Sequence, residues 1–99
     1  MALDFGRSSV TIPPGTGHRS IKGFVDFGRP VARAGAAVEG FKFDYLNDDH
    51  HINIVEADVD VTATPGNRVE FTVECQYGDK NFDDSYQGYV SVLVIADTL

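Results

Sequence analysis

The sequence predicts an all-β protein that forms one domain over residues 1–99, with five or six antiparallel strands in a β-sandwich or small barrel. Apolar residues alternate with polar ones in most segments, which is typical of strands with one buried face. The 10 Gly and 4 Pro stand mostly between these segments, where turns are expected. No segment has a convincing helical period, and a chain of this length can bury only one modest core.

Three strands are expected in the first half of the chain. The first covers residues 9–12 and stops at the turn Pro13-Pro14-Gly15. The second covers residues 19–27, where Ile21 begins a period-two pattern. The third covers residues 31–44, and although it is rich in Ala, its apolar positions also recur at period two and Gly35 weakens a helix. Its small side chains allow another layer or another subunit to approach closely.

A polar loop over residues 45–50 precedes a fourth strand, residues 51–64, which ends at Pro65-Gly66-Asn67. The apolar positions of this strand change phase, because Ile52 and Ile54 are even-numbered and the apolar residues from Val55 to Val61 are odd-numbered. A slip of one residue turns later side chains to the other face, so a β-bulge is expected between Asn53 and Glu56.

The last two strands are expected at residues 68–77 and 86–96. Cys75 is in phase with the apolar positions of the first of them and is interpreted as a small buried hydrophobe; being the only cysteine, it forms no internal disulfide. The segment 90–96 is apolar on both faces. We therefore expect one face of this strand to cover the core and the other to contact a neighbouring subunit.

The charge balance narrows the choice of partners. The net charge is −7, from 15 Asp and Glu against 8 Lys and Arg, which argues against binding nucleic acid or an anionic membrane surface. No apolar stretch is long enough to span a bilayer. Residues 1–7 lack the pattern of a secretory signal peptide, which leaves a cytoplasmic location and export by a non-classical route both open.

The polar loop between the last two strands contains the first candidate site. Asp79, Asn81 and Asp83 alternate as oxygen ligands do around Ca²⁺, but an EF-hand loop requires Gly and Glu where this chain has Asp84 and Val90. A calcium site is therefore the weaker interpretation. A solvated hairpin and a ligand contact in a subunit groove are the alternatives.

A second polar loop, Asp48-Asp49-His50-His51, offers carboxylates and imidazoles to a zinc-like ion, but adjacent residues of an extended chain point apart. A hydrophilic turn is the better interpretation. No nucleophile elbow or phosphate-binding loop is present, and carboxylate pairs without a cleft do not indicate acid–base catalysis. We therefore expect no enzymatic activity.

The segment 21–31, I-K-G-F-V-D-F-G-R-P-V, resembles the second and third strands of the H-type lectin domain family. Further similarity follows in 59–64, the turn at Pro65, 69–71, 77–79 and the final strand 89–96. The resemblance implies a six-stranded antiparallel β-sandwich that forms trimers, or hexamers as dimers of trimers. It further implies shallow sites between subunits that bind galactose or N-acetylgalactosamine.

The resemblance also implies the residues of a sugar site. Tyr77 stands at the family's loop aromatic, and Tyr86 or Tyr89 stands at the tyrosine that opens the last strand. Tyr77, Asp79 and Tyr86 are the expected sugar contacts, with Asp83 and Arg33 as additional ones. The chain contains no Trp, which the family often uses in this loop, so the fold transfers better than the sugar specificity.

The leading hypothesis is thus a non-catalytic carbohydrate-binding protein, of the kind that serves cell adhesion, with several equivalent sites in a homo-oligomer. One alternative is a structural oligomerisation module of a phage tail or secreted assembly, without sugar binding. The other is an adhesin-like domain stabilised by calcium.

Overall fold

A computed structural model of the chain describes residues 2–46, 52, 54–78 and 84–99. The described part contains six strands and no helix, which confirms the all-β prediction: β1 (Ala2–Gly15), β2 (Arg19–Asp26), β3 (Val31–Tyr45), β4 (Ile54–Ala63), β5 (Arg68–Gly78) and β6 (Tyr86–Thr98). Every paired strand is antiparallel to its neighbours. None of the described residues belongs to a helix long and apolar enough to cross a membrane.

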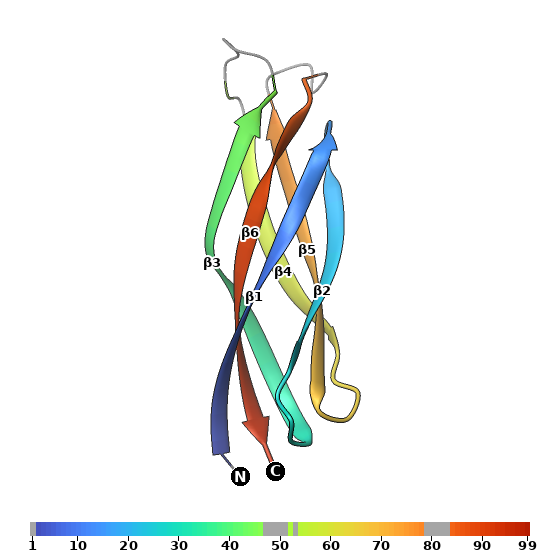
Figure 1. The fold of residues 1–99 in the computed structure, drawn as a ribbon, viewed down its shortest axis with the longest axis vertical. Coiled ribbons are helices and arrows are strands. Elements are labelled where there is room, and N and C mark those ends of the chain that lie inside the picture. The colour runs from blue at the N-terminus through green and yellow to red at the C-terminus, as the bar shows by residue number, and fades with distance from the viewer. Residues whose placement is uncertain (1, 47–51, 53, 79–83) are drawn as a thin grey trace.

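The strands form two three-stranded sheets, in the orders β1-β6-β3 and β2-β5-β4, so the architecture is a six-stranded β-sandwich (Figure 1). The body measures 50 × 17 × 17 Å, and its radius of gyration is 15.4 Å, against roughly 13 Å for a compact domain of this length. Both termini lie at one end, here called the terminal end (Figure 1). Gly15, Tyr45, Gly78 and Tyr86 mark the opposite end, here called the loop end.

The core lies between the sheets and is built from alternate residues of each strand. Strands β5 and β6 supply most of its fully buried side chains, among them Val92, Val73 and Cys75. The interpretation of Cys75 as a buried hydrophobe is confirmed. Gly23 of β2 permits close contact between the layers, because a Cβ there would lie 2.6 Å from the Phe71 ring and 2.9 Å from Val10.

Strand β1 begins at Ala2, seven residues before the predicted start at Ser9, and pairs with β6 in unbroken register from Ala2 to Ile12. The prediction was too short because the pattern of this segment is inverted. Asp4, Gly6 and Ser8 share the inward side with buried Val10, whereas Leu3 and Phe5 face outward and are 68% and 67% exposed. When the apolar residues of a strand face outward, their alternation with polar residues does not indicate which face covers the core.

The β-bulge predicted between Asn53 and Glu56 is wrong for the described part of that segment. Strand β4 begins at Ile54, and its pairing with β5 is continuous from Ile54 to Val61; the irregularity lies between Val61 and Ala63. No slip is needed because Ile54 takes the outer side, opposite Gly78, while Val55 faces Tyr77. Asn53 and His51 lie outside the described residues.

Candidate functional site

The two predicted tyrosines lie at the loop end, inside an aromatic cluster. Tyr77 and Tyr86 are 9% and 0% exposed, and their ring centroids are 5.8 Å apart in an edge-on arrangement. Phe43 lies 5.8 Å from Tyr86, and Tyr45 lies 4.7 Å from Tyr77. The cluster closes the core where the sheets end, so the ring of Tyr86 presents no surface to a ligand in this structure.

The hydroxyl of Tyr86 also has a structural role. It donates a hydrogen bond of 2.7 Å to the carbonyl oxygen of Gly17. Because its proton is used there, the thiol of Cys75 is the donor across the 3.8 Å contact between the sulfur and the Tyr86 oxygen. Burial raises the pKa of Tyr86 above its ordinary value, and burial likewise raises the pKa of the Cys75 thiol.

Arg33 does not join these tyrosines within one chain. It lies on the outer side of β3 at the terminal end, where its Nε donates to Oδ2 of Asp97 at 3.3 Å. Tyr77 and Tyr86 lie at the other end of a body 50 Å long. The remaining predicted contacts, Asp79 and Asp83, and the candidate metal ligand Asn81 lie outside the described residues. The Asp and His of the second polar loop, 48–51, also lie outside them.

A hollow of about 410 Å³ lies at the loop end, on the outer side of sheet β1-β6-β3. We call it the Tyr89 hollow; its lining is Thr11, Ile12, Pro13, Pro14, Lys42, Asp44, Gln87, Gly88 and Tyr89. Its shape follows from the Pro-Pro pair, because proline has no N–H for the ladder and the pairing of β1 with β6 shifts between Ile12 and Gly15. On the β3 side of the hollow, Gly88 allows β3 to lie close to β6, since a Cβ at this position would collide with the carbonyl oxygen of Lys42.

The side chains of the Tyr89 hollow combine an aromatic face with hydrogen-bonding groups. Tyr89 is 43% exposed. Lys42 Nζ and Asp44 Oδ2 are 3.4 Å apart and both side chains are solvent-accessible. Gln87 adds an amide that both donates and accepts. The opposite charges balance, so the hollow suits a neutral ligand with several hydroxyl groups.

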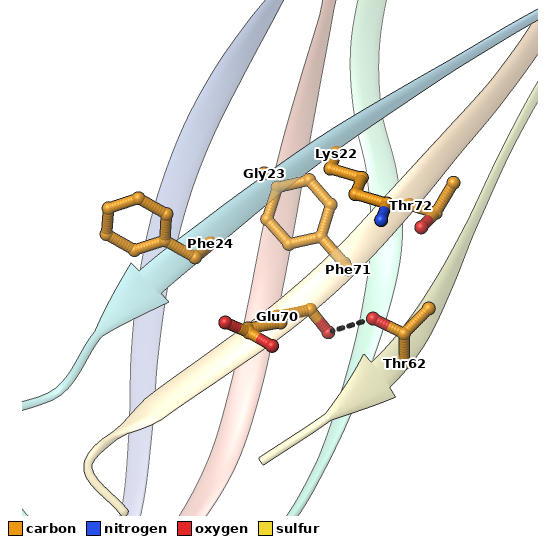
Figure 2. Close-up of a pocket in the computed structure, with 7 residues that line it drawn as sticks. All are labelled: Lys22, Gly23, Phe24, Thr62, Glu70, Phe71 and Thr72. Carbon is orange, nitrogen blue, oxygen red and sulfur yellow. Dashed lines mark hydrogen bonds between the residues drawn. The ribbon is translucent and has the colours of Figure 1, made fainter. Parts of the chain in front are cut away.

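A second hollow, about 390 Å³, lies on the other sheet (Figure 2). Two aromatic residues line it: Phe71 is buried, whereas Phe24 is 51% exposed. Thr62 Oγ1 donates to the backbone oxygen of Glu70 at 3.3 Å. The guanidinium of Arg68 lies 4.1 Å from the centroid of the Phe24 ring. Because the cation already covers this ring, Phe24 is the weaker platform for a ligand.

Three carboxylates, Asp58, Asp60 and Glu74, also gather on the outer side of β4 and β5, with ligand atoms within 4.8 Å of one another. Asp58 lies opposite Glu74 in the strand pairing, so the geometry of the sheet brings them together. Exposed acidic groups commonly gather without an ion in an acidic protein, and no metal is assigned to them.

Comparisons with known proteins add no relative: the chain matches no family model, no curated protein and no solved structure. The resemblance to H-type lectins therefore stays a prediction. The Tyr89 hollow was not predicted as such, because its lining comes from three strands that are far apart in sequence and its shape depends on a shift in register.

Proposed function

We propose that this chain is a non-catalytic carbohydrate-binding module of the H-type lectin kind that works as a homo-oligomer. The observation that supports the proposal best is the exposed ring of Tyr89 beside the Lys42–Asp44 ion pair, in a hollow open to solvent. Sugars present C–H faces that pack on aromatic rings and hydroxyl groups that both donate and accept hydrogen bonds.

In this proposal the sugar stacks on Tyr89 and its hydroxyl groups bond to the polar lining. Asp44 accepts, Lys42 donates, and Gln87 does both. An aromatic contact contributes ~1 kcal/mol and each hydrogen bond a similar net amount, so one site binds only weakly, in the range of ~1 mM. Galactose and N-acetylgalactosamine are the sugars to test first, on the strength of the family resemblance. Several sites in one oligomer raise the apparent affinity.

The test is a titration of the isotopically labelled protein with galactose, N-acetylgalactosamine and glucose, followed by NMR. We expect saturable shifts at Thr11, Gln87 and Tyr89, which Tyr89→Ala abolishes. The matched control is Phe24→Ala, which removes an aromatic of similar exposure, 51% against 43%, from the other sheet and leaves the shifts intact. The proposal fails if no sugar shifts these signals, or if Phe24→Ala abolishes binding and Tyr89→Ala does not.

A structural assembly module without sugar binding is the second candidate. The observation that favours it is the apolar outer side of sheet β1-β6-β3, where Leu3 and Phe5 are more than half exposed. A glycan array probed with the oligomer separates the two: a stable oligomer that binds no glycan supports assembly alone.

A further inference from the structure

The outer sides of the two sheets differ in chemistry. On sheet β1-β6-β3, the half nearest the termini presents Leu3, Phe5 and Ile95, which are 68%, 67% and 39% exposed, beside the small residues Gly35 and Ala37. We call these five residues the apolar face. The outer side of sheet β2-β5-β4 is predominantly charged, with Lys22, Asp58, Asp60, Arg68, Glu70 and Glu74. Large exposed apolar patches usually mark an interaction surface.

The pairing of the strands makes the apolar face uneven in height. Phe5, Ile95 and Gly35 stand side by side in one row across β1, β6 and β3. The row therefore falls from a large side chain on β1 to none on β3. A Cβ added at Gly35 would meet no atom within 4 Å, so the space above this glycine is open. Towards the termini this space continues as a groove of about 360 Å³, lined by Leu3, Ile95 and the Arg33–Asp97 pair together with Ala34 and Gly35.

We propose that the apolar face binds a second copy of the same chain, with β1 of one copy lying over β3 of the other at the same height. A rotation axis parallel to the strands produces this arrangement, because it keeps the height of every residue and exchanges the two edges of the sheet. Phe5 of one copy then fills the space above Gly35 of the other. The inference rests on the oligomeric part of the proposed function and identifies its surface.

Charge supports a second copy as the occupant, because the face is complementary to itself in charge. Arg7 of β1 bonds to Glu39 of β3 at 2.7 Å across β6, so stacking β1 over β3 places Arg7 of one copy near Glu39 of the other.

The arrangement has a consequence for the Tyr89 hollow, which lies on the same side of the sheet. Packed sheets cross at about 30°, so each sheet is inclined by about half that angle to the axis, and strands that overlie each other at the apolar half separate sideways towards the loop end. The hollow then stays open beside the neighbouring copy. Because the axis still runs along the length of the molecule, all copies present their hollows at the same end of the oligomer.

Substitutions within the apolar face test the proposal by analytical ultracentrifugation of the full chain. We expect the wild type to sediment as an oligomer, and Phe5→Glu and Gly35→Lys to weaken association at least tenfold. Gly35→Lys is the sharper variant, because open space above Gly35 lets the single chain fold normally. Phe24→Glu is the matched control on the other sheet and keeps the oligomer. Circular dichroism melting verifies that each variant is folded.

The outcomes separate this inference from the proposed function. A wild type that stays monomeric at every soluble concentration overturns both the interface and the oligomeric part of that function. An oligomer that survives both Phe5→Glu and Gly35→Lys overturns the interface alone. Sugar titration of the monomeric variants reports on the hollow independently of either result.

The stacking of β1 over β3 has its own test. A Phe5→Cys chain and a Gly35→Cys chain are mixed, allowed to exchange, and treated with a short bismaleimide; Cys75 is buried and does not react. We expect cross-links between the two variants in the mixture and none in either variant alone. Cross-links that form as readily in Phe5→Cys alone would overturn this arrangement, because they place β1 over β1.

Discussion

The hydroxyl of Tyr86 donates to the carbonyl oxygen of Gly17 over 2.7 Å, and this bond joins the start of the last strand to the turn between β1 and β2. The two residues are 69 positions apart in sequence. Gly17 has a φ of 71°, a conformation that favours glycine. A buried tyrosine thus holds a turn at the loop end, beside the Pro-Pro segment that borders the Tyr89 hollow.

Loss of this hydroxyl is expected to destabilise the fold. Tyr86→Phe leaves the carbonyl of Gly17 without its donor; because this bond is part-buried, its loss is expected to cost ~1 kcal/mol. Urea unfolding at neutral pH measures the change in free energy. Tyr89→Phe removes a hydroxyl from an exposed tyrosine in the same strand and serves as the control with little effect. If Tyr86→Phe and the wild type have the same free energy of unfolding, the bond makes no net contribution to stability.

Alkaline pH is expected to reduce stability through Tyr86 and Cys75. Burial raises the folded-state pKa of both, from ordinary values of 10.0 and 9.0. The unfolded chain therefore loses these protons at lower pH than the folded chain. As a result, the free energy of unfolding is unaffected by these two groups below about pH 9 and falls as the pH rises above 9 to 10. Urea unfolding between pH 7 and pH 11 measures this fall. The variant with both Tyr86→Phe and Cys75→Ala should show a flatter profile, and an unchanged profile in it would contradict the assignment.

The strand prediction succeeded where one face is apolar and the other polar. In β5, Val69, Phe71 and Val73 alternate with Glu70 and Thr72, and the structure buries the apolar set completely. The first half of β1 escaped prediction because its outward positions are the apolar ones. The small-residue pattern of β3 was correctly interpreted as a strand.

The candidate site was less predictable, since a site depends on contacts that the sequence does not display. Tyr77 and Tyr86 flank a polar loop, which suggested a ligand role, yet the sheets end there and the rings are needed to close the core. Arg33 was grouped with them, but the direction of β3 places it at the other end of the molecule.

Gly23 faces the core and Gly35 faces outward, so we expect an added methyl group to change the stability in opposite directions at the two positions. Gly23→Ala forces a Cβ against Phe71 and Val10, and overpacking of this kind costs ~1–3 kcal/mol. Gly35→Ala meets open space and should be neutral or stabilising by up to ~1 kcal/mol, because alanine has less backbone entropy to lose. Urea unfolding in the monomeric Phe5→Glu background measures both without a contribution from association. If Gly23→Ala is as stable as Gly35→Ala, the layers are not in the close contact described.

Calcium is expected to leave the melting temperature unchanged, because the proposed function requires no metal. The comparison is thermal unfolding in calcium and in EGTA. A rise in calcium that EGTA reverses would instead support the adhesin-like alternative. In that event, two double variants locate the ion: Asp79→Asn with Asp83→Asn, in the loop between the last two strands, and Asp58→Asn with Asp60→Asn, in the acidic cluster on β4.

Avidity links the apolar face to the Tyr89 hollow. If the hollows act together in an oligomer, Phe5→Glu should retain the weak affinity for a free monosaccharide and lose ~10²–10⁴-fold in apparent affinity for a surface coated with the same sugar. Phe24→Glu should retain both affinities. Surface plasmon resonance at low and high sugar density, together with NMR titration of the free sugar, measures them. Equal loss of both affinities in Phe5→Glu would mean that the neighbouring copy supplies part of each site, because single-site binding would then depend on association.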